Sequence, residues 1–173
     1  MLTFTYEVPN KVRMSTKIPI INEQGEPVFT LQKNQHRFFA RIVHDTVRGG
    51  LPYCYKVNDM NGEFFYSIVC TFPGIRYQLT EQSSQQMIPI TSHRVQLIEK
   101  AYSFLLNNHT YYFERDATNA GHLKCDNQQI ATVYLPFDPD IWKKIDKIIV
   151  KATTKEIAAL AAVLYHTFYY YDA

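Results

Sequence analysis

The segment KEIAALAAVLYHTF, residues 155–168, most constrains what this chain can fold into. From Ile157 onward no periodic polar stripe interrupts its apolar residues. Thr153 or Thr154 provides an N-cap, and Glu156 lies near the positive end of the helix dipole. A helix that is apolar on every side must be buried on every side, either in a membrane or inside a protein.

The length of the apolar run weighs against the membrane. A spanning helix needs about 20 apolar residues, and this run stops at His166, so a tail anchor would be short. In a protein interior, a helix about 10–12 Å across needs more room than an eight-stranded barrel, which its own side chains fill. The segment therefore predicts a wider barrel around a central helix at about residues 154–171. Its core residues are expected to be Ile157, Leu160, Val163, Leu164 and Phe168.

The rest of the chain is typical of β-structure. Aromatic residues make up 14% of the sequence, and they favour half-buried, pleated surfaces. The runs at 53–58 and 63–70 predict a hairpin, because Asn61 and Gly62 between them adopt positive φ at low cost.

A second predicted hairpin joins residues 18–21 to 27–33, and HRFFARIV at 36–43 predicts a longer strand. No linker divides the sequence. We therefore expect a mainly β, single-domain protein over residues 1–173. It should be a closed antiparallel barrel of about twelve strands, within residues 2–151, around the buried C-terminal helix.

Composition and motifs exclude several classes of function. A net charge of +2 is too small to indicate a nucleic-acid partner. Three scattered cysteines and the lack of a visible secretory signal indicate a cytoplasmic protein without disulfides. No nucleotide-binding or hydrolase motif is present, so we expect no enzyme and no cofactor. His122 and Cys125 have H-x-x-C spacing but no second close pair, so no metal site is predicted.

Positive charge is the remaining functional signal. Alternation along the predicted strand 36–43 would place Arg37 and Arg41 on one face, on either side of an aromatic ring. Lys33 and Lys56 lie nearby along the chain. Arginine forks bind phosphate oxygens well, so these four residues are candidates for binding an anionic ligand. The alternative is an ordinary solvated strand face.

Three segments together resemble the tubby C-terminal-like superfamily, which includes the LURP-one-related proteins and the phospholipid scramblases. They are IPIINEQGEPVFTLQK, YKVNDMNGEFFYSI and KKIDKIIVKATTKEIAALAAVLYHTF. The first two are similar to the strand–turn–strand units of that family. The third is similar to its last strand and central helix. The chain lacks the long N-terminal region of tubby proteins and the cysteine-rich run of scramblases.

The resemblance implies a barrel whose interior is filled by the helix, so that function lies on the outer wall, the rims or the loops. It also implies a non-enzymatic module that binds anionic phospholipid headgroups peripherally at a membrane, with no integral membrane segment. The alternative is a protein–protein interaction or structural module with an unidentified protein partner. Headgroup binding should weaken in salt, whereas an aromatic protein interface should not.

Overall fold

The computed structural model describes residues 1–35, 41–42, 46, 53–71, 76–94, 100–136 and 145–170. Within them, twelve strands precede the helix α2 (Lys155–Phe168). The strands are β1 (Leu2–Pro9), β2 (Ile18–Asn22), β3 (Pro27–Asn34), β4 (Cys54–Asn58), β5 (Phe64–Thr71), β6 (Arg76–Glu81), β7 (Met87–Arg94), β8 (Lys100–Leu106), β9 (His109–Arg115), β10 (Gly121–Cys125), β11 (Gln128–Tyr134) and β12 (Ile145–Ala152).

These strands form one closed antiparallel barrel, as the sequence predicts. Each strand pairs with its neighbours in sequence, and β1 pairs with β12 to close the ring. The closing register runs from Leu2 opposite Ala152 to Pro9 opposite Ile145. Because each of the twelve described strands is paired on both sides, none offers a free edge to which a partner strand could add.

Both predicted hairpins are confirmed, as β2–β3 and β4–β5. Their turns contain Gly25 and Gly62, whose φ angles are 83° and 90°. In the second turn, the Asp59 carboxylate accepts hydrogen bonds from the backbone N–H groups of Asn61 and Glu63, both at 2.9 Å. Such a side chain replaces the backbone partners that a turn leaves unsatisfied. The hairpins therefore follow from local turn chemistry.

The strand predicted at 36–43 is wrong where the structure describes it. Arg41 and Ile42 are helical and exposed, and the other residues of that segment lie outside the described ones. In the ring, β3 pairs directly with β4, with Asn34 opposite Cys54. The run RVQLIEK at residues 94–100 also has a strand-like pattern, but most of it lies outside the described residues.

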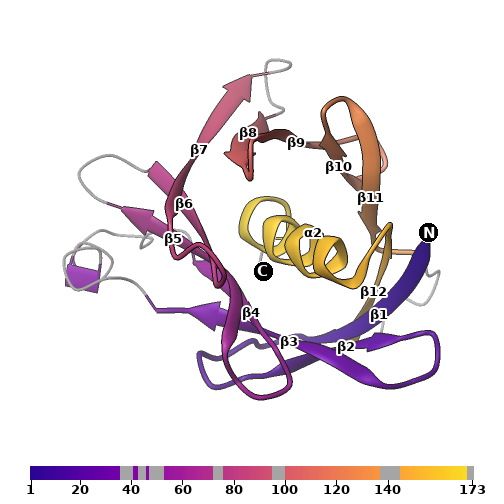
Figure 1. Cartoon of the computed structure of the whole chain (residues 1–173). Helices are drawn as coiled ribbons and strands as arrows, with labels where there is room; N and C mark the ends of the chain where they lie inside the picture. Colours follow the sequence, from indigo (N-terminus) through magenta and orange to yellow (C-terminus); the bar gives the residue numbers. More distant parts are fainter. Residues whose placement is uncertain are drawn as a thin grey trace.

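The helix lies inside the ring of strands (Figure 1). Thr154 is its N-cap, and the Thr154 hydroxyl accepts a hydrogen bond from the N–H of Ile157. Every residue from 158 to 168 is buried, whereas Ile157 is only partly buried. Of the helix residues expected in the core, Leu160, Val163, Leu164 and Phe168 are buried. The helix ends at Phe168 rather than near 171. No helix among the described residues is long and apolar enough to cross a membrane.

The strands alternate in direction, so the connections between them fall at two ends of the barrel. The end that we call the turn end has the short turns after β2, β4, β6, β8 and β10, together with the first turn of α2. The opposite end, the loop end, has the connections after the odd-numbered strands and the last residues of α2. There the Tyr170 hydroxyl donates to Asp146 at 2.7 Å, and the Tyr165 hydroxyl donates to the carbonyl of Asn119 at 3.2 Å.

Gly121 of β10 lies close to Tyr165 of the helix. A Cβ atom at this position would lie 2.8 Å from Phe113 Cζ and 3.0 Å from Tyr165 Cδ2. Both rings are buried and have little room to move. We therefore expect Gly121→Ala to lower the free energy of unfolding by about 1–3 kcal/mol, the usual cost of overpacking. Urea denaturation measures this.

The control for this measurement is Ser83→Ala in an exposed turn, which should change stability by less than about 0.5 kcal/mol. A Gly121→Ala variant as stable as the wild type would contradict the close packing of the helix against β10.

Candidate anionic-ligand surface

Carboxylates dominate the turn end. The connections at this end, the terminal residues of the strands that they join and the first turn of α2 contain seven acidic residues and one basic residue, Lys155. The acidic residues are Glu23, Glu26, Asp59, Glu63, Glu81, Asp126 and Glu156. Negative charge is stabilising beside a helix N-terminus. This end of the barrel therefore suits cations rather than anionic ligands.

The loop end has the opposite charge. In the corresponding positions, the described residues include six exposed cations, which we call the cationic rim: Lys11, Arg13, Lys17, Arg41, Arg76 and Arg94. Arg115, at the end of β9, is only partly exposed. Among the described residues of this end, the carboxylates are Asp116 and, one position into β12, Asp146. The net charge of +2 conceals this separation, because it sums the two ends.

The charges of the cationic rim are not neutralised within the described part of the chain. None of the six side chains forms an ion pair with another described residue. By contrast, the Asp116 carboxylate is engaged with His122 Nε2 at 2.8 Å and with the backbone N–H of Thr118 and Ala120. Partial desolvation raises the pKa of Asp116, but these hydrogen bonds outweigh it and hold that pKa well below its usual range.

The rim lies along an arc of consecutive strands rather than around one pocket. Lys11, Arg13 and Lys17 come from the β1–β2 connection and Arg41 from the β3–β4 connection. Arg76 begins β6 and Arg94 ends β7. An extended anionic surface would meet such an arc better than one small ligand could, because long basic side chains can reach separate phosphates.

The structure separates the two lysines predicted from the sequence. Lys33 points into the barrel, is buried, and has its ammonium 4.4 Å from the centre of the Tyr53 ring. Lys56 lies beside Gln32 and Ser67 on the outer face. In β3, the buried side chains are those of Phe29, Leu31 and Lys33. Which of the two alternating faces of a strand is buried could not be predicted from the closeness of two lysines in the sequence. Lys33 and Lys56 therefore do not form one surface.

The shared face expected for the two predicted arginines stays a prediction. Arg37 lies outside the described residues, and Arg41 is helical. Arg41 nevertheless belongs to the cationic rim. The other members of that rim were missed by reasoning from single strands. A comparison of the charges in the connections after odd-numbered strands with those in the connections after even-numbered strands could have found them.

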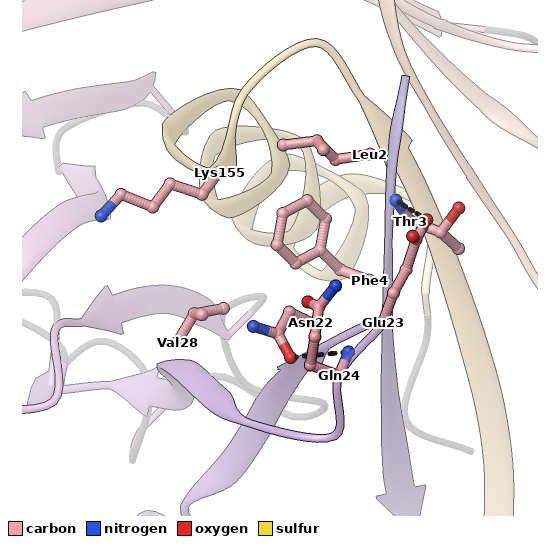
Figure 2. Close-up of a pocket in the computed structure, with 8 residues that line it drawn as sticks. All are labelled: Leu2, Thr3, Phe4, Asn22, Glu23, Gln24, Val28 and Lys155. Carbon is pink, nitrogen blue, oxygen red and sulfur yellow. Dashed lines mark hydrogen bonds between the residues drawn. The ribbon is translucent and has the colours of Figure 1, made fainter.

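The barrel interior is occupied by α2 itself, as the sequence predicts. Neither of the two surface hollows described below lies inside it. One hollow, of about 200 Å³, lies beside the N-terminus of α2 (Figure 2). Phe4, Leu2 and Val28 give it an apolar lining, and Glu23 and Lys155 lie around them. It is smaller than the roughly 300–1,000 Å³ typical of ligand pockets.

A second hollow, of about 500 Å³, lies on the wall near the β10–β11 turn. Its lining residues are Thr110, Tyr112, Lys124, Asp126 and Asn127. The Lys124 ammonium lies 2.5 Å from Glu114, so this cation is already paired.

The described cysteines and histidines do not form the reactive or metal-binding pair that the spacing of His122 and Cys125 suggests. Burial raises the pKa of the Cys54 and Cys70 thiols, which makes both poor nucleophiles. His122 binds Asp116 and not Cys125, so the H-x-x-C pair is not formed. The adjacent His44 and Asp45, residue types that catalytic triads use, lie outside the described residues.

Comparison with known proteins gives one match. The family model described as the Tubby C-terminal like domain matches residues 4–171. The match covers all twelve strands and the central helix apart from the first residues of β1. No curated protein and no solved structure is significantly similar to the chain.

Proposed function

Because this chain belongs to the tubby C-terminal-like family, we propose that it is a non-enzymatic, cytoplasmic binding module that attaches peripherally to membranes through anionic phospholipid headgroups. The observation that carries the proposal is the cationic rim at the loop end. A filled barrel and buried, weakly nucleophilic cysteines are consistent with binding rather than catalysis.

The size of the effect follows from the number of unpaired cations. Each lysine or arginine near an anionic membrane contributes about 1 kcal/mol, and salt screens this contribution. The six residues of the cationic rim together can hold the protein on such a surface at low ionic strength. The acidic turn end would then face away from the membrane, because anionic lipid repels it.

Co-sedimentation with liposomes tests the proposal. Vesicles of neutral lipid are compared with vesicles containing phosphatidylserine or a phosphoinositide, each at low and high salt. We expect binding to the anionic vesicles only, and loss of that binding in high salt. The triple variant Lys17→Gln, Arg76→Gln, Arg94→Gln should weaken binding about 100-fold, which corresponds to about 3 kcal/mol.

A matched control removes the same charge elsewhere. The variant Lys56→Gln, Lys151→Gln, Lys155→Gln also changes the net charge by −3, but its residues lie away from the cationic rim. It should bind nearly as well as the wild type. Equal weakening by both triple variants would mean that net charge, rather than the loop end, governs binding.

The competing function is a protein–protein interaction module. This function is favoured if the protein binds to none of the liposomes, or if its binding depends neither on salt nor on the lipid headgroup. The closed barrel limits how such a partner could dock, because none of its described strands has a free edge. A partner would have to contact side chains of the wall or the connections.

A further inference from the structure

We propose a zinc-binding site at the turn end of the barrel, formed by His109, Cys125 and Asp126. One ligand atom from each of these residues lies within 4.8 Å of the other two. Zn²⁺ takes nitrogen, sulfur and oxygen ligands in a tetrahedral arrangement. The site is independent of lipid binding, since the cationic rim lies at the other end.

Strand pairing brings these residues together. His109 begins β9, and Cys125 ends β10, where it stands opposite Tyr111. Asp126 follows at once, in a turn where Asp126 and Asn127 have φ angles of 47° and 67°. The three ligands therefore come from two adjacent strand ends and the tight turn that follows one of them.

The carboxylate of Asp126 is already held in place. Its Oδ1 accepts a hydrogen bond from the N–H of Thr110 at 3.0 Å, and its Oδ2 lies 2.5 Å from His109 Nδ1. These contacts place the imidazole and the carboxylate side by side. Residues that bind a metal are commonly held in orientation by hydrogen bonds to neighbouring groups, and the hydrogen bond from Thr110 would do this for the Asp126 carboxylate.

The distances suit a tetrahedral ion after a small movement. Ligand atoms around tetrahedral zinc lie about 3.5 Å apart, as bond lengths of about 2.0–2.3 Å require. The widest separation, at most 4.8 Å, would shorten around an ion, whereas the 2.5 Å between His109 Nδ1 and Asp126 Oδ2 would lengthen, both through small side-chain rotations. The exposed side-chain fractions of His109 and Asp126 are 57% and 54%, so both can rotate and an ion can reach them.

The surroundings favour a cation. The seven carboxylates of the turn end attract positive ions. The nearest lysine along the chain, Lys124, has its charge engaged by Glu114. Cys125 is the one cysteine that is not buried, whereas Cys54 and Cys70 are. With three protein ligands, the fourth position is open to water, as in zinc sites that are not purely structural.

Cobalt titration of the purified full chain, reduced and free of chelator, tests this site. Co²⁺ bound to a thiolate gives a charge-transfer absorption in the near ultraviolet, which a carboxylate–imidazole site lacks. We expect this band to saturate at one Co²⁺ per chain and to disappear when Zn²⁺ is added. Cys125→Ser should abolish the band, and His109→Gln and Asp126→Asn should each weaken Co²⁺ binding about tenfold or more.

Matched controls keep the result specific. His93→Gln and His122→Gln remove other histidines of the wall and should bind Co²⁺ as the wild type does. The thermal midpoint of each metal-free variant shows whether it is folded. The proposal is overturned if the wild type gives no band, if Cys125→Ser retains it, or if His109→Gln binds as tightly as the wild type.

Discussion

Lowering the pH from 7 to 4 should destabilise this protein by about 3 kcal/mol through one side chain, His166. His166 lies within α2 and is 2% exposed. The rings of Tyr6, Tyr55 and Tyr170 pack around it, with centroids 4.6–5.4 Å away. Neither ring nitrogen has a hydrogen-bond partner among the described residues. A charged imidazolium would therefore be strongly disfavoured there.

The direction of the effect follows from the pKa values. Burial lowers the pKa of His166 to about 3 in the folded protein, from 6.5 when the residue is exposed to water. The unfolded chain thus binds a proton below pH 6.5 that the folded chain does not. The stability is fully present above about pH 6.5 and is lost as the pH falls toward 3. Ordinary aspartate and glutamate have pKa values of about 3.9 and 4.3, so they contribute mainly at the acidic end of this window, and comparison with variants of His166 isolates its share.

Urea denaturation at several pH values between 7 and 4 measures this loss. A neutral replacement, His166→Phe or His166→Asn, should flatten the dependence of unfolding free energy on pH, whatever its stability at pH 7. The exposed His93→Gln is the control and should keep the wild-type slope. A flat wild-type profile, or a His166 variant with the wild-type slope, would show that His166 is not buried in solution.

Leu164→Ala should lower the free energy of unfolding by roughly 3–5 kcal/mol, the upper part of the range for buried leucines. Leu164 has no exposed surface and lies on the helix that fills the barrel. The cost depends on how far the surroundings collapse into the cavity. A barrel closed by continuous strand pairing from β1 to β12 can shrink little, so most of the cavity should remain.

The matched substitution is Leu105→Ala, which removes the same atoms from a side chain that is 59% exposed on the outer wall. It should change the stability by less than about 0.5 kcal/mol. Both variants are measured by urea unfolding at pH 7 with an unchanged m-value. A loss below about 1 kcal/mol for Leu164→Ala would be incompatible with a helix enclosed by the barrel.

Local signals allowed the main elements to be predicted. Thr154 caps α2 and the following residues are apolar on all sides, so the helix and its burial can be read from adjacent residues. The hairpins at Gly25 and Gly62 depend on turn residues a few positions apart. The segment 36–43 shows the limit of this reasoning. Its residues favour a strand, but β3 and β4 already pair with each other.

The candidate sites depend on contacts that no local pattern encodes. Lys33 and Lys56 are both basic strand residues, yet one faces the core and the other the solvent, because the register of β3 and β4 sets the phase of each. His109 and Cys125 are sixteen positions apart and meet only because β9 and β10 pair with a particular register.

The sequence by itself determined a mainly β barrel with a buried C-terminal helix, because helix polarity and turn chemistry are properties of neighbouring residues. Only the tertiary structure decided how the charges are distributed. The alternating strands carry seven carboxylates to the turn end and six exposed cations to connections of the loop end. The reason is geometric: which residues share a surface depends on strand direction and register, and both are fixed only when the ring closes.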